Sequence, residues 1–205
     1  MTCAEIELKF PIADLDALQS RLPGLGFHLD TPRTFEHNTL YDTPTRDLRT
    51  RRQILRLRQY GSLCTVTHKR HPEHEDPIEM QRYKVRIETE TTITDGEALA
   101  EIFQQLGYAP AFIYDKYRSE WSQPLPETPE LRAHLVIDET PIGNYAELEG
   151  PAKWIDHTLE ALNVQPSECL TESYGKLFLT WKMRTGDPAE HLTFDAVDSL
   201  QLTGR

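Results

Sequence analysis

Charged and apolar side chains alternate along several segments of this chain, beginning with EIELKF at residues 5–10. Side chains of a strand point alternately to its two faces, so Glu5, Glu7 and Lys9 would share one face and the apolar residues the other. The same alternation recurs in ILRLR, KVRIETE, DKYRSE and NYAELE. Either the charged faces meet solvent, as in an ordinary half-buried strand, or they point inward together and line a wet cavity.

The surrounding segments predict many short antiparallel strands and a few helices. Strands are expected at residues 5–10, 54–61, 62–70, 83–93 and 113–121, and in a hairpin that turns at residues 140–144. Amphipathic helices are expected at 12–22, 95–107, 150–162 and 171–183, and three of them follow a strand that carries Glu-x-Glu. Residues 1–184 are expected to form one domain, and 185–205 a tail to which no structure is assigned.

The helices favour the inward arrangement of charge. If the apolar faces of the strands filled a barrel, the apolar stripes of the helices would have nothing to cover. The inward set would then be Glu5, Glu7, Lys9, Arg56, Arg58, Lys69, Lys84, Arg86, Glu88, Glu90, Lys116, Arg118, Glu120, Asp138, Glu147 and Glu149. It holds eight cations and eight carboxylates, whereas the whole chain has 22 Lys and Arg against 33 Asp and Glu. The excess negative charge therefore belongs to the outer surface.

So many charges inside a barrel require water, counter-ions or a ligand, because desolvating each ion costs several kcal/mol. An eight-stranded barrel is wide enough for one small ligand. Paired carboxylates offer hard oxygen ligands to Mg2+ or Mn2+, and clustered Arg and Lys side chains match phosphate oxygens. The pattern thus fits a metal-bound polyphosphate.

Composition excludes several other classes of function. A net charge of -11 and a pI near 5.2 argue against a surface that binds nucleic acid or anionic lipid. The sequence has no apolar run of about 20 residues, and charges stand where a secretory signal would be apolar, so we expect a cytoplasmic protein. The three cysteines have no metal-type spacing, and no P-loop is present.

The ordered motifs resemble a known family. EIELK, LYDTPTRDL, ILRLR, THKR, VRIETE, DKYRSE, VIDETPIGNYAELEG and ESYGKL follow one another between residues 4 and 180. In this order they resemble the CYTH superfamily, also called triphosphate tunnel metalloenzymes, which includes class IV adenylyl cyclases, thiamine triphosphatases and inorganic triphosphatases. The resemblance implies an α+β fold in which an eight-stranded antiparallel barrel forms a triphosphate tunnel, with helices packed outside.

The resemblance also implies roles for particular residues and a divalent cofactor, Mg2+ or Mn2+. The metal ligands implied are Glu5, Glu7, Asp138, Glu147 and Glu149. The substrate-binding cations implied are Lys9, Arg56, Arg58, Lys69, Arg86, Lys116 and Arg118, and the catalytic set is Glu5, Glu7, Lys9, Glu88 and Glu90. One departure is RRQILRLR, where the family often has a small residue; Gln53 is expected to alter the mouth of the tunnel but not its phosphate cradle.

Three functions stay open at this stage. The first is a metal-dependent phosphohydrolase acting on inorganic triphosphate, thiamine triphosphate or a nucleoside triphosphate. The second is a class IV adenylyl cyclase that converts ATP to cyclic AMP and pyrophosphate with the same cradle. The third is a polyphosphate-binding module without turnover, against which the full set of carboxylates counts. The expected partner is a small-molecule triphosphate, not nucleic acid or a membrane. The sequence leaves open whether the protein forms a homodimer.

Overall fold

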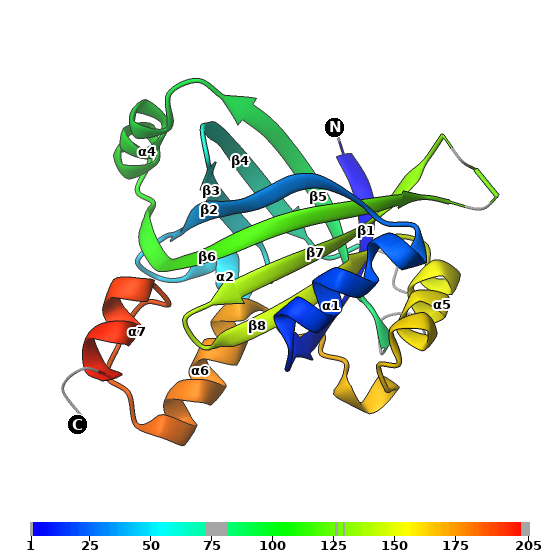
Figure 1. Ribbon diagram of the computed structural model, residues 1–205. Coiled ribbons are helices and arrows are strands. Elements are labelled where there is room, and N and C mark those ends of the chain that lie inside the picture. The colour runs from blue at the N-terminus through cyan, green and yellow to red at the C-terminus, as the bar shows by residue number, and fades with distance from the viewer. Residues whose placement is uncertain (1, 73–81, 126, 129, 202–205) are drawn as a thin grey trace.

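The protein is built around a closed barrel of eight antiparallel strands, which confirms the expected fold (Figure 1). The computed structural model describes residues 2–72, 82–125, 127–128 and 130–201, and for 2–5 and 198–201 it describes only the backbone. The strands are β1 (Thr2–Ile12), β2 (His28–Asp42), β3 (Ile54–Tyr60), β4 (Leu63–Arg70), β5 (Lys84–Ile93), β6 (Ala109–Pro124), β7 (Arg132–Thr140) and β8 (Gly143–Glu149). Around the barrel they follow the order β1-β5-β4-β3-β2-β6-β7-β8.

Helices cover the outer wall on one side of the barrel. The helices described are α1 (Leu15–Arg21), α2 (Asp47–Thr50), α4 (Gly96–Gln105), α5 (Ala152–Leu162), α6 (Tyr174–Thr185) and α7 (Phe194–Gln201), with short 3-10 turns at Pro23–Leu25 and Pro166–Glu168. α1 and α5 pack on β1, β7 and β8, where Leu8, Leu135 and Leu148 are buried in one apolar cluster (Figure 1). The apolar faces of these strands therefore point outward under the helices, and their charged faces point into the lumen.

The chain ends in a second apolar cluster at one end of the barrel. α6 and α7 contribute Tyr174, Phe178 and Val197 to it, and Tyr114 of β6 joins them. Leu192, which precedes α7, exchanges backbone hydrogen bonds with β6, through Asp115 N at 2.9 Å and Ile113 O at 3.0 Å. The helix expected at 171–183 is therefore not the last one, and the residues that follow it carry a helix that packs against α6.

Several local expectations are confirmed by the register and the caps. Tyr60 pairs with Leu63 across the β3–β4 turn, and Thr140 pairs with Gly143 across the β7–β8 turn. The Asp95 carboxylate accepts a hydrogen bond from Ala98 N at 2.9 Å and caps α4. The Glu-x-Glu strands β1, β5 and β8 do each lead into a helix, namely α1, α4 and α5.

Strand β2 was not expected from the sequence, although it closes the barrel between β3 and β6. Its first half is irregular, with register shifts against β6 between Leu29 and Thr34, around Pro32. Proline cannot donate to a strand ladder and weakens a strand pattern. The regular half of β2 places Glu36 and Asn38 in the barrel, fully buried.

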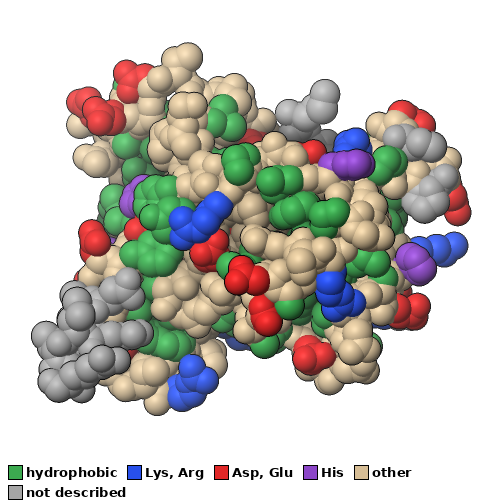
Figure 2. Space-filling view, in the orientation of Figure 1, with side chains coloured by type: hydrophobic (Ala, Val, Ile, Leu, Met, Phe, Trp, Pro, Cys, Tyr) green, Lys and Arg blue, Asp and Glu red, His purple; other side chains and the backbone are tan. Residues whose placement is uncertain are grey.

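The outer face drawn in Figure 2 fits the expectation that many of the cations lie inside the barrel. Lys and Arg side chains, in blue, stand singly on this face and do not gather into a patch (Figure 2). Hydrophobic side chains and backbone cover much of the remainder of the view. On this face, at least, the cations are not concentrated outside the barrel.

Candidate active site

A cavity of about 1100 Å3 lies inside the barrel and is lined by charge. Fourteen of the sixteen residues expected to face inward line it: Glu7, Lys9, Arg56, Arg58, Lys69, Lys84, Arg86, Glu88, Glu90, Lys116, Arg118, Glu120, Glu147 and Glu149. Glu5 lies on β1 opposite Arg86 of β5, but its side chain is outside the described residues. Asp138 is fully buried behind the cations of β6. The alternation in the sequence thus located the lumen correctly.

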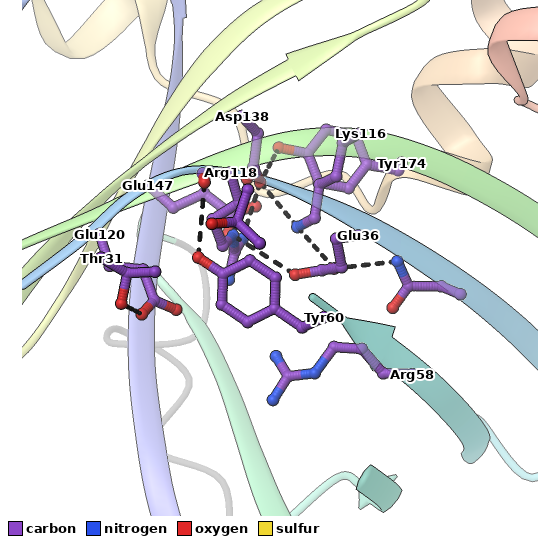
Figure 3. A network of polar contacts seen from close by, with 12 residues as sticks. Thr31, Glu36, Arg58, Tyr60, Lys116, Arg118, Glu120, Asp138, Glu147 and Tyr174 are labelled. Carbon is purple, nitrogen blue, oxygen red and sulfur yellow. Dashed lines mark hydrogen bonds and ion pairs between the residues drawn. The ribbon is translucent and has the colours of Figure 1, made fainter. Parts of the chain in front are cut away.

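Asp138 is the centre of a buried hydrogen-bond network (Figure 3). Its carboxylate accepts from Lys116 Nζ at 2.9 Å, from Arg118 Nε and Nη2 at 2.7 Å each, and from the Tyr174 hydroxyl at 2.7 Å. Both oxygens already have donors, so a metal ion would have to replace some of them. The geometry places Asp138 to hold Lys116 and Arg118 in position, and its role as a metal ligand stays a prediction.

The β1–β8 wall brings carboxylates and lysines into direct opposition. Glu7 is paired in register with Glu149, and Lys9 with Glu147. Lys9 Nζ lies 2.5 Å from Glu147 Oε1, Arg118 Nη2 lies 2.9 Å from Glu147 Oε2, and Lys84 pairs with Glu7. Burial alone would raise the pKa of Glu147, but Lys9 and Arg118 hold it well below its usual value. This wall therefore presents an ionised Glu147 to the lumen.

The opposite wall carries the arginines of β3. Arg58 Nη2 lies 3.2 Å from Glu90 Oε1, and Arg56 Nη2 lies 3.4 Å from Glu90 Oε2. Lys69 of β4 pairs with Glu88 of β5. These cations are held by carboxylates of β5, and the planar guanidinium groups of the arginines are suited to oxyanions such as phosphate. The structure thus gathers the predicted cradle in one cavity, while its role in binding stays a prediction.

Glu36 is a lumen residue that the sequence reasoning missed. It is fully buried, with Oε1 3.3 Å from Lys116 Nζ and 2.9 Å from the Asn38 side-chain nitrogen. Burial would raise the pKa of Glu36, but Lys116 and Arg118 lower it to about 2. Glu36 and Asn38 stand two residues apart, as side chains on one face of a strand do, and this spacing was the available signal. It was missed because β2 was not recognised as a strand.

Tyr174, at the start of α6, closes the network at the end of the barrel. Lys9 Nζ lies 3.9 Å from the centroid of its ring, and Lys116 Nζ lies 5.2 Å from it. Burial and the Asp138 carboxylate raise the pKa of Tyr174 well above its usual value. The ring of Tyr174 therefore contacts the two lysines from α6, and its neutral hydroxyl reaches Asp138.

The donor set fits a Mg2+ or Mn2+ ion that is shared with a phosphate ligand. Among the residues whose side chains are described, no three His, Cys, Asp or Glu groups form a ready metal cage. Mg2+ is usually held by one or two carboxylates together with waters and substrate phosphates, so such a cage is not needed. Glu7 and Glu149, which face each other on β1 and β8, offer the hard oxygen atoms that such an ion takes.

Comparison with known proteins shows the family. The sequence model of the CYTH domain matches residues 4–164. A protein of Methanocaldococcus jannaschii named "putative adenylate cyclase" is 27% identical over 180 residues, which cover 84% of this chain and 97% of that protein. The chain belongs to the CYTH domain family.

Solved structures share the fold. A Pyrococcus horikoshii protein superposes with a TM-score of 0.63 at 21% identity, over 86% of this chain and 99% of the other. A Hippeastrum protein superposes with a TM-score of 0.59 at 19% identity, over 88% and 96%. The Hippeastrum protein is described as a "putative adenylyl cyclase" with a dominant triphosphatase activity. In the described part of this chain, none of the helices combines the length and apolar character needed to cross a bilayer.

Proposed function

We propose that the protein is a divalent-metal-dependent phosphohydrolase that binds a linear triphosphate in the barrel. One observation carries the proposal: a single cavity joins the carboxylates of β1 and β8 to the arginines and lysines of β3, β4 and β6. A binding module would need the cations, but it would gain little from opposed carboxylates such as Glu7 and Glu149. The cytoplasmic location is part of the same proposal and rests on the sequence.

The ion pairs of the lumen give the cations a second role on substrate binding. Lys9 and Lys84 each neutralise a carboxylate, Glu147 and Glu7. Triphosphate oxygens that enter the lumen would compete for these lysines and free the carboxylates to face the metal. Buried charges exchanged in this way stay compensated, which avoids the cost of an unpaired ion in the interior.

The residues can support hydrolysis without a dedicated protein base. A bound divalent ion lowers the pKa of water and neutralises phosphate charge. Water attacks the terminal phosphorus and loses a proton to solvent, the bond between that phosphorus and the bridging oxygen breaks, and tripolyphosphate yields orthophosphate and pyrophosphate. Lys116 and Arg118, fixed by Asp138, are positioned to stabilise the charge that develops on the phosphate oxygens.

An adenylyl cyclase is the second candidate, favoured by the name of the M. jannaschii relative. It would use the same cradle but align the ribose 3'-hydroxyl of ATP with the alpha phosphorus. The triphosphatase activity described for the Hippeastrum protein supports hydrolysis instead.

Product analysis separates these candidates. Purified protein is incubated with Mg2+ or Mn2+ and with tripolyphosphate, thiamine triphosphate or ATP in separate reactions, and the products are resolved by phosphorus NMR. We expect orthophosphate from tripolyphosphate, because the cradle holds phosphates and needs no nucleoside. Cyclic AMP from ATP, with no orthophosphate from tripolyphosphate, would establish the cyclase. No turnover of any of the three would favour the binding module.

A further inference from the structure

Three arginines stand at the mouth of the cavity, outside the predicted cradle. Arg46, Arg49 and Arg52 flank or belong to the short helix α2, between the end of β2 and the start of β3, and all three line the cavity. Their side chains are exposed, and none forms an ion pair or side-chain hydrogen bond with another described residue. Solvated surface arginines would look the same, so the case depends on how the chain holds them.

The loop that carries these arginines is fixed by one buried carboxylate. Asp42 accepts backbone hydrogen bonds from Thr43 at 2.8 Å, Leu48 at 2.9 Å and Arg49 at 3.1 Å. Leu48 is buried beneath the loop and anchors it to the barrel. A turn held in this way presents its side chains with little ordering cost on binding.

Two of the arginines have backbone conformations that are energetically unfavourable for this residue type. Arg46 has φ 60° and Arg52 has φ 55°, in the left-handed region that glycine and asparagine adopt more readily. The other described non-glycine residue with positive φ is Asn163, for which this conformation is common. Strained positions filled by a costly residue are concentrated at functional sites. Arginine at these two positions therefore points to a use for its charge.

The charge balance of the mouth favours an anionic occupant. Lys182 of α6 lines the cavity together with the three arginines. Of the acids in this region, Asp42 is engaged by backbone N–H groups, and Glu172 pairs with Lys176 at 3.3 Å. Glu190 also lines the cavity, and Asp47 belongs to the arginine loop without lining the cavity, so the cations at the mouth outnumber the remaining acids.

The cavity also has more room than a triphosphate needs. Its volume of about 1100 Å3 lies just above the range of roughly 300–1,000 Å3 that is typical for drug-sized ligands. Arg52 precedes Arg56 of the cradle by four residues, at most about 14 Å of extended chain. One linear ligand can therefore reach from the cradle to the mouth.

We propose that Arg46, Arg49 and Arg52 form an additional anion subsite, which binds phosphate groups beyond the third of a polyphosphate. The inference rests on the proposed function, because it assumes that the lumen holds the first three phosphates. It narrows the ligand class to compounds with four or more phosphates in a row. These are free linear polyphosphate or a nucleoside that carries such a chain, and the shared feature is the extra phosphate.

The test compares ligands that differ by one phosphate. Calorimetry with Ca2+ in place of Mg2+, to limit turnover, gives the affinities for tripolyphosphate, linear tetraphosphate and adenosine tetraphosphate. We expect the wild type to prefer tetraphosphate to tripolyphosphate by about tenfold, the scale of one charge-assisted contact. If linear tetraphosphate binds more tightly than tripolyphosphate, the ligand is free polyphosphate. If only adenosine tetraphosphate binds more tightly, the ligand is a nucleotide.

The double variant Arg46→Asn/Arg52→Asn removes two charges while relieving both strained positions. We expect it to unfold at the same urea concentration as the wild type or a higher one, and to lose most of the preference for the fourth phosphate. Arg51→Asn is the matched control, because Arg51 lies in the same loop, is exposed and does not line the cavity. Its ratio of affinities should equal that of the wild type.

Failure of this inference is distinguishable from failure of the proposed function. If the protein binds tripolyphosphate but the double variant keeps the full preference for tetraphosphate, the subsite does not exist. The same conclusion follows if the wild type shows no preference. If tripolyphosphate itself does not bind, the proposed function fails.

Discussion

Replacing Glu149 with Gln is expected to reduce metal-dependent hydrolysis of tripolyphosphate by more than about 100-fold while the protein stays folded. Glu149 lines the cavity and pairs in register with Glu7, so the two carboxylates would be ligands of the proposed metal ion. Glutamine keeps the shape of the side chain but removes the charge. Even partners that only orient a ligand change metal affinity or activity by about 10–100-fold, so loss of a ligand should cost more.

The measurement is a titration of activity with Mn2+, supported by circular dichroism to establish that the variant is folded. Glu101→Gln provides the matched control, because Glu101 is exposed on α4 and does not line the cavity. It should hydrolyse tripolyphosphate at the wild-type rate. A folded Glu149→Gln protein with wild-type activity would remove this residue from the proposed metal site.

The second large effect is on stability. Asp138→Asn is expected to lower the free energy of unfolding in metal-free buffer by about 3–5 kcal/mol. The substitution leaves Arg118 and Lys116 in the interior without the carboxylate that receives their hydrogen bonds. Arg118 keeps Glu147 and Lys116 keeps Glu36 as partners, so the cost comes from the excess of positive charge left in the buried network.

Urea denaturation of both proteins without metal gives the difference. Asp115→Asn is the control, since it makes the same change on the outer face of β6, where Asp115 contacts His37 at 2.7 Å. Its cost should be clearly smaller than that of Asp138→Asn, because Asp115 is itself buried but its partner His37 has a side chain that is 44% exposed. If Asp138→Asn is as stable as the wild type without metal yet fails to bind Mn2+, Asp138 is a ligand rather than the centre of the network.

The lumen could be predicted because the charged face of an alternating strand has only two possible directions, out to solvent or into the barrel. The apolar residues beside Glu7 and Lys9 need helices to cover them, and helices pack on the outside of a barrel. The charged side chains of the same strand must therefore face inward. The contacts in the cluster around Leu8, Leu135 and Leu148 show that α1 and α5 do cover them. The side chains that met this pattern on β3, β4, β5, β6 and β8 were found in the cavity.

The remaining parts depend on contacts that the sequence does not display. Glu36 was missed because the bulged first half of β2 conceals a strand, and its burial depends on Lys116 of a distant strand. Helix α7 is amphipathic but has only eight residues, and Val197 places it in the same apolar cluster as Phe178 of α6. The mouth arginines looked like ordinary surface charge, and only φ and the hydrogen bonds of Asp42 set them apart.

The central claim is that one barrel cavity holds both the triphosphate and its metal ion. A crystal structure with Mn2+ and tripolyphosphate, with anomalous diffraction recorded for manganese, tests it most directly. We expect a manganese peak on the β1–β8 wall, within bonding distance of Glu7 or Glu149, and phosphates against Arg58 and Lys116. A triphosphate bound outside the barrel, or manganese away from these carboxylates, would contradict the claim.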